Sequence, residues 1–88
     1  MKLTKYETTI LYQLYQLASD IVNAWDYNHP LTETILMNYL IEFGKKCKDD
    51  SQISEDFYMW YIEPYEEEQW SNEHLQKIVD DWELGNYN

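Results

Sequence analysis

The sequence has 88 residues, of which 17 are acidic and 6 are basic, and its formal net charge is −11. The length predicts a single domain over residues 1–88, and a hydrophobic share of 44% is too high for a disordered acidic protein. Arginine is absent and the net charge is negative. Direct binding to DNA or RNA is therefore disfavoured, because phosphate recognition needs the opposite sign.

The first predicted element is a helix over about residues 4–25. Thr4 and Glu7 have the spacing of a capping box, in which each side chain accepts a hydrogen bond from the other residue's backbone N–H. Apolar residues then recur at intervals of three and four, the pattern of an amphipathic helix. These positions are Ile10, Leu14, Leu17, Ile21 and Trp25.

A second helix is predicted over about residues 32–47, after a turn that ends at Pro30. Thr32 is the expected N-cap, and Glu33 places a negative charge in the first turn, where the helix dipole favours it. The apolar face consists of Leu36, Met37, Leu40, Ile41 and Phe43. Gly44 leaves open an end one turn earlier.

A short third helix is predicted over residues 54–63. Ser54 is a suitable N-cap, and Glu55 and Asp56 follow it in the first turn. The next six residues, FYMWYI, are all apolar or aromatic, so their periodicity also permits a buried strand. Helix is favoured because the chain offers no second strand to pair with, and Pro64 is expected to end it.

The last predicted helix begins with Ser71 as its N-cap and ends at Gly85. Its apolar positions are Leu75, Ile78, Val79 and Trp82. The complete prediction is an all-α fold, a compact bundle of three longer helices and one short aromatic helix.

Net charge is divided unevenly along the chain. Residues 1–48 hold as many lysines as acids, so residues 49–88, with Lys77 as their single base, carry the whole net charge of −11. Such asymmetry is typical of an interaction surface and predicts a basic protein partner.

Catalytic and metal-binding motifs are lacking. His29 and His74 both have ordinary explanations near a turn and a helix start, and Cys47, although two lysines precede it, fits an ordinary helix end. The His, Cys and Gly residues are too few for a zinc site or a phosphate-binding loop, and the acids lack the spacing of a calcium loop. We therefore expect no enzyme activity, no metal and no cofactor.

The cellular compartment is predicted from the cysteine count and from the lack of targeting segments. A single cysteine cannot form an intramolecular disulfide, which fits a reducing cytoplasm. The sequence contains neither a recognisable signal peptide nor an apolar run of about 18 residues, the length of a membrane span. We expect a soluble cytoplasmic protein that does not contact a membrane.

The stretch from Glu55 to Trp70 is the densest combination of aromatic and acidic residues in the chain, and it permits two interpretations. In the first, Phe57, Met59, Trp60 and Ile62 belong to the core, Tyr58 and Tyr61 are half-buried, and the glutamates form a solvated loop. In the second, some of Tyr58, Tyr61, Tyr65 and Trp70 are exposed among acids and form the hot spots of an interface.

The order of these elements resembles that of colicin-type DNase immunity proteins. The resemblance spans about residues 10–84 and rests on the short aromatic helix with Tyr58 and Tyr61, the acidic loop after it, and the last helix with Trp82. It implies a helical bundle whose exposed tyrosines and acids block a nuclease. The family's adjacent tyrosine pair followed directly by proline is replaced here by the stretch from Tyr58 to Pro64, and its glycine-rich tail is missing.

In composition the chain also resembles small acidic anti-CRISPR and anti-restriction proteins of phages, some of which mimic DNA. The resemblance implies an inhibitor that acts in the host cytoplasm on a nuclease or another nucleic-acid-binding protein. A toxin-nuclease immunity protein, a non-inhibitory adaptor or small subunit, and a homodimer remain open alternatives. The residues expected to bind the partner are Tyr58, Tyr61, Glu63, Tyr65, Glu66, Glu67, Glu68, Asp80, Asp81 and Glu83.

Overall fold

The computed structural model describes residues 2–63 and 72–85, and every regular element in these two ranges is a helix. Helices α1 (Lys5–Asp26) and α2 (Pro30–Cys47) are followed by a short helix that begins as α3 (Glu55–Phe57) and continues as the π-helix η1 (Tyr58–Ile62). The last helix is α5 (Asn72–Leu84). The predicted all-α fold with three longer helices and one short helix is confirmed.

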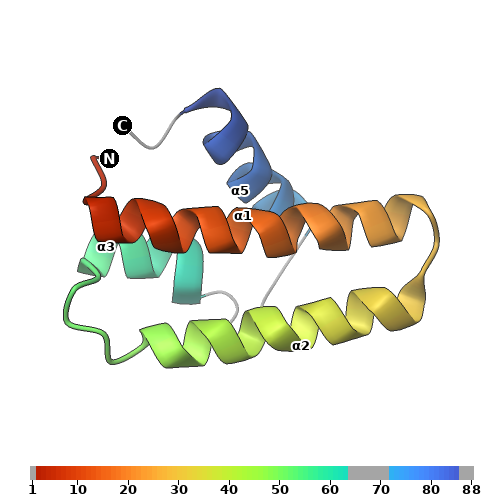
Figure 1. Cartoon of the computed structure of the whole chain (residues 1–88), viewed down its shortest axis with the longest axis horizontal. Helices are drawn as coiled ribbons and strands as arrows, with labels where there is room; N and C mark the ends of the chain where they lie inside the picture. Colours follow the sequence, from red (N-terminus) through yellow and green to blue (C-terminus); the bar gives the residue numbers. More distant parts are fainter. Residues whose placement is uncertain (1, 64–71, 86–88) are drawn as a thin grey trace.

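Helix α1 is the centre of the arrangement. It packs against both α2 and α5, and Figure 1 shows α2 returning alongside α1 while α5 crosses α1 on another side. The α3–η1 segment lies beside the first half of α1. The fully buried large side chains come from all of these helices and form one core: Leu11, Leu14, Ile21, Leu40, Phe57, Ile62, Leu75 and Ile78. Burying one such side chain stabilises the fold by roughly 1.5–3 kcal/mol.

The start of α1 confirms the predicted capping box. The Thr4 hydroxyl accepts a hydrogen bond from the Glu7 backbone N–H at 3.1 Å, and the Glu7 carboxylate accepts one from the Thr4 backbone N–H at 3.0 Å. The other oxygen of Glu7 accepts hydrogen bonds from the backbone N–H and the hydroxyl of Ser54, at 3.0 and 2.8 Å. One carboxylate therefore holds the N-terminal ends of α1 and α3 together.

Helix α2 begins at Pro30, two residues before the predicted start, and its N-cap lies three residues before the predicted one. The N-cap is His29 rather than Thr32, and Pro30 occupies the first turn, where its fixed φ suits a helix and its missing N–H has no helical partner to lose. His29 makes no side-chain capping bond, and its backbone N–H donates instead to the carbonyl of Ala24 at 2.8 Å. Gly44 lies inside α2, which continues to Cys47 as predicted.

The short third helix is confirmed, and the alternative of a strand is wrong. Ser54 caps it by accepting a hydrogen bond from the Phe57 backbone N–H at 3.2 Å. From Tyr58 the helix widens to a π-turn, in which the Glu63 N–H donates to the Tyr58 carbonyl. This wider turn changes which side chains face the core.

Helix α5 packs through the predicted positions. Leu75, Ile78 and Val79 are buried, and Trp82 is partly buried against the core. Gly85 ends the helix with a left-handed φ of 71°, as predicted for this residue type. The predicted N-cap Ser71 lies outside the described residues. No helix in the described part of the chain has both the length and the apolar character needed to span a membrane.

Candidate partner-binding surface

The residues predicted to bind a partner fall into two groups in the structure. Tyr65, Glu66, Glu67 and Glu68 lie outside the described residues, as does Trp70. Among the described ones, Asp80 and Glu83 are exposed on α5, whereas Tyr58, Glu63 and Asp81 are partly buried and Tyr61 is buried: its relative exposure is 3%.

The third helix exposes different side chains from those expected. Met59 and Trp60, assigned to the core in one interpretation, are 55% and 54% exposed, so that assignment is wrong. Tyr61, which was expected to be half-buried or exposed, is packed against Phe57 with ring centroids 5.0 Å apart. In a π-helix the backbone hydrogen bonds join residues five apart rather than four, which widens the turn. In this wider turn both Tyr61 and Ile62 are buried with Phe57, whereas Met59 and Trp60 are exposed.

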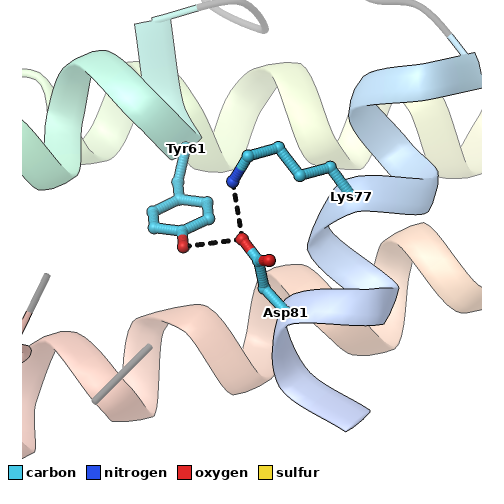
Figure 2. Close-up of polar contacts among 3 residues, drawn as sticks. All are labelled: Tyr61, Lys77 and Asp81. Atoms are coloured by element: carbon cyan, nitrogen blue, oxygen red, sulfur yellow. Dashed lines mark hydrogen bonds and ion pairs between the residues drawn. The ribbon is translucent and has the colours of Figure 1, made fainter. Parts of the chain in front are cut away.

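Tyr61 is anchored by a polar contact to α5 (Figure 2). Its hydroxyl donates a hydrogen bond to Oδ2 of Asp81 at 2.9 Å, and the Lys77 ammonium contacts the same oxygen at 2.6 Å. Burial, and then the bond to the Asp81 carboxylate, raise the pKa of the Tyr61 hydroxyl well above its ordinary value. The hydroxyl is therefore a permanent hydrogen-bond donor to Asp81 at physiological pH.

The Lys77 ammonium also lies near two aromatic rings. Its Nζ is 4.8 Å from the centroid of the Tyr61 ring and 5.0 Å from that of the Trp60 ring. Both distances fall within the range of cation–π attraction, about 6 Å. The single base of the acidic half of the chain is thus held by two rings and one carboxylate.

An open groove of about 770 Å³ lies beside this cluster, between the C-terminal half of α1 and α5. Val22, Trp25 and Leu84 give it apolar walls. Its charged residues come from both helices and are mostly acidic: Asp26, Glu73, Lys77, Asp80 and Asp81. Negative charge on low-dielectric walls concentrates the local field, so this groove favours cations.

A second aromatic group joins the first half of α1 to the last turn of α5. The ring of Trp82 lies 5.0 Å from that of Tyr12 and 5.9 Å from that of Tyr15, measured between centroids. The Tyr15 hydroxyl also donates a long hydrogen bond, 3.4 Å, to Glu83. A shallow hollow of about 340 Å³ next to this group is lined by Thr8, Thr9, Tyr12 and Trp82. The exposed acid Glu83 is thereby placed beside aromatic surface.

Burial shifts the pKa values of His74 and Cys47. Burial, followed by the nearby charge of Lys77, lowers the pKa of His74, so this imidazole is neutral at physiological pH. Burial, followed by the nearby charge of Asp50, raises the pKa of the Cys47 thiol. Within residues 2–63 and 72–85, no group of three His, Cys, Asp or Glu side chains is placed so that it could hold a metal ion.

Sequence reasoning missed several residues of this surface. Asp26, Glu73 and Lys77 line the groove, and the Lys77 ammonium lies over the ring of Trp60. The spacing of Lys77 and Asp81, four residues apart in a predicted helix, is a signal for their ion pair. No local signal places Asp26 of α1 across from α5, because their proximity depends on how the two helices pack.

Comparisons of the chain with protein-family models, with curated proteins and with solved structures found no significant match.

Proposed function

We propose that this protein is a non-enzymatic inhibitor that binds a basic, nucleic-acid-binding protein and blocks its cationic groove. The observation that carries the proposal is the groove between α1 and α5, where Asp26, Glu73, Asp80 and Asp81 converge beside apolar walls. Anti-CRISPR and anti-restriction proteins of phages are the kind of inhibitor we have in mind. The action would take place in the cytoplasm of the host.

The physical basis of the proposal is substitution of carboxylates for phosphates. A protein that binds nucleic acid presents a positive surface, and carboxylates held on packed helices can occupy that surface without a large ordering cost. Met59 and Trp60 are exposed on η1. Tyr61, which follows them in the same helix, donates a hydrogen bond to Asp81 of the groove. Aromatic side chains of this kind commonly supply the binding energy of an interface, while charges speed the encounter.

The test is capture of partners on the immobilised protein from a lysate of the source cells, with stepwise elution by salt. We expect a nucleic-acid-binding protein that elutes between about 50 and 200 mM salt, the range over which charge-driven binding weakens most clearly. Duplex DNA added to the lysate should compete with the capture. A salt-resistant partner without a basic surface, or one indifferent to DNA, would contradict the proposal.

A matched pair of variants tests where the partner binds. Glu73→Lys combined with Asp80→Lys reverses two exposed acids of the groove, and Glu42→Lys combined with Asp49→Lys reverses two exposed acids elsewhere. Both double variants change the net charge equally. We expect the groove variant to lose the partner and the other variant to keep most of it; equal losses would mean that only net charge matters.

A second candidate function, that of a non-inhibitory adaptor or small subunit, is favoured by a different surface. Leu31, Ile35 and Tyr39 are exposed at intervals of four residues along one face of α2. An apolar stripe of this kind suits a hydrophobic interface that tolerates salt. Leu31→Glu with Ile35→Glu should abolish partner capture if this function is the correct one, and leave it intact if the acidic groove binds the partner.

A further inference from the structure

We propose that Trp60, Tyr61 and Asp81 form a receptor site for one lysine side chain of the partner, and that Lys77 fills this site in the free protein. The inference rests on the proposed function, since the basic partner supplies the incoming lysine. We call these three residues and the space that the Lys77 ammonium occupies the cation site.

The geometry of the cation site is that of ammonium recognition. The Lys77 Nζ lies 2.6 Å from Oδ2 of Asp81, 4.8 Å from the Tyr61 ring centroid and 5.0 Å from the Trp60 ring centroid (Figure 2 shows Tyr61, Lys77 and Asp81). Two electron-rich faces and one carboxylate attract an alkylammonium more strongly than a carboxylate alone. The 2.9 Å bond from the Tyr61 hydroxyl fixes the orientation of Asp81, so the site is held in place from the core side.

The outer wall of the cation site is open to solvent. Trp60 is 54% exposed, and the side chain of Lys77 itself is 37% exposed. Phe57, one turn earlier, is by contrast fully buried in the core. The Asp81 side chain is 14% exposed in the presence of Lys77, so its carboxylate becomes accessible to a side chain from another protein when the Lys77 ammonium moves away.

Lys77 is suited to be displaced. It is bound through an ion pair within one helix, four residues from Asp81, and partly exposed pairs of this kind contribute little to stability. Lys77 also lines the groove that contains Glu73 and Asp80. When a partner lysine enters the cation site, the Lys77 ammonium moves towards these acids, and no charge is left buried without a counterion.

The test compares two variants with the same net charge. Lys77→Met removes the ammonium from the cation site and keeps an unbranched apolar side chain, whereas Lys45→Met removes an exposed ammonium paired with Glu42 on α2. Each is titrated with an acetylated, amidated trilysine peptide while NMR follows the indole N–H resonances. We expect Lys77→Met to bind roughly tenfold more tightly than Lys45→Met, with the largest shift at the Trp60 indole.

Two further variants identify the residues that bind the peptide. Adding Trp60→Leu or Asp81→Asn to Lys77→Met should return the affinity to that of Lys45→Met. Adding Asp80→Asn, which removes a neighbouring charge of the groove, should leave most of the gain. Lys77→Gln repeats the measurement with a polar side chain, and circular dichroism verifies that each variant is folded.

Equal peptide affinities of Lys77→Met and Lys45→Met would overturn the cation site. The proposed function would then still be tested by the salt-sensitive capture of a partner, which does not depend on Lys77. Conversely, tighter peptide binding by Lys77→Met without any DNA-competed capture would support the cation site and contradict the proposed inhibitor.

Discussion

Glu7 is the buried charged residue among those described, with 2% relative exposure, and its carboxylate receives hydrogen bonds at two helix starts. Burial alone raises the pKa of this carboxyl, but the hydrogen bonds donated by Thr4 and Ser54 outweigh burial and lower its pKa below the ordinary value. The ionised form is thus the one that the fold binds. Its hydrogen bonds connect α1 with the segment that carries Trp60.

Glu7→Gln is predicted to destabilise the fold by about 1–3 kcal/mol at neutral pH. The glutamine amide can accept hydrogen bonds only through its oxygen, so its NH₂ group would face either the Thr4 or the Ser54 donors. Urea unfolding measures the effect. Glu42→Gln, at an exposed position of α2, is the control and should change stability by less than about 0.5 kcal/mol.

The effect of Glu7→Gln should depend on pH with a defined sign. Because the pKa of Glu7 is lower in the folded protein, its stabilisation is complete above the unfolded pKa, about 4.3, and is lost as pH falls through the folded pKa. The stability difference between the wild type and the variant should therefore shrink in acid. A difference that is constant from neutral pH to about pH 3 would contradict this role of the ionised carboxylate.

Tyr61→Phe is predicted to cost about 1.5 kcal/mol, the lower end for a bond to a charged group, because Asp81 keeps Lys77 as a partner. Its pH dependence lies at the alkaline end. The raised pKa of Tyr61 means that its contribution is present below about pH 10 and is lost as pH rises towards the folded pKa. Thermal unfolding at neutral and alkaline pH measures both effects; a larger cost at alkaline pH than at neutral pH would contradict the assignment.

At the scale of elements, the change from α3 to the π-helix η1 decides what the third helix presents. A π-turn places residues five apart on one side, and here Phe57 and Ile62 face the core while Met59 and Trp60 face solvent. Turns of this type occur often at functional sites. The element that departs from regular helical geometry is also the one that carries Trp60, the exposed aromatic residue of the proposed cation site.

The end of α5 supports a prediction about backbone conformation. At φ 71°, Gly85 adopts a left-handed conformation, and a Cβ at this position would meet no atom within 4 Å. Gly85→Ala should therefore destabilise the fold by about 1 kcal/mol through backbone strain alone. Gly85→Asn should cost less, since asparagine tolerates this region; thermal unfolding compares the two, and a larger loss for asparagine would contradict this explanation.

Local sequence signals predicted the helix ends well where one residue supplies a capping hydrogen bond or adopts a positive φ. Thr4 and Ser54 cap helices because their hydroxyls satisfy free N–H groups, and Gly85 ends one because it accepts positive φ. The prediction of Thr32 as an N-cap was wrong because Pro30, two residues earlier, starts the helix without any side-chain cap. The apolar run from Phe57 to Ile62 gave no periodicity from which a π-turn could be derived.

The candidate site was less predictable than the helices because it depends on contacts between distant residues. The bond between Tyr61 and Asp81 spans 20 residues, and that between Glu7 and Ser54 spans 47. Composition correctly located the acids in the second half of the chain, but only packing brings Asp26 to them. A run of aromatic residues likewise shows that some must be exposed, without showing which.

At the scale of the whole molecule, a net charge of −11 on 88 residues opposes compaction. The acids of α5 and the groove repel one another. Among the described residues that line the groove, Lys77 is the base that offsets this repulsion. A basic partner would relieve the remainder. Binding of a basic partner should therefore also raise the free energy of unfolding of the protein.

Salt is predicted to raise the melting temperature of the free protein. Raising the ionic strength shortens the Debye length to about 10 Å at 0.1 M, which screens acids from one another more than it weakens the few ion pairs. If screening recovers about 1 kcal/mol, the melting temperature should rise by roughly 4–8 °C. Calorimetry in sodium chloride measures this. A fall on adding salt would mean that attractive pairs outweigh repulsion.

The central position of α1 determines the order in which parts of the molecule can fold during synthesis. Both α2 and α5 pack on α1, yet α2 follows it after a short turn, whereas the groove needs residues as far along as Leu84. A nascent chain can form the α1–α2 hairpin early, since translation is slow compared with helix formation. It gains the acid-lined surface only after α5 has left the ribosome, so under the proposed function an unfinished chain would not bind the basic groove of a partner.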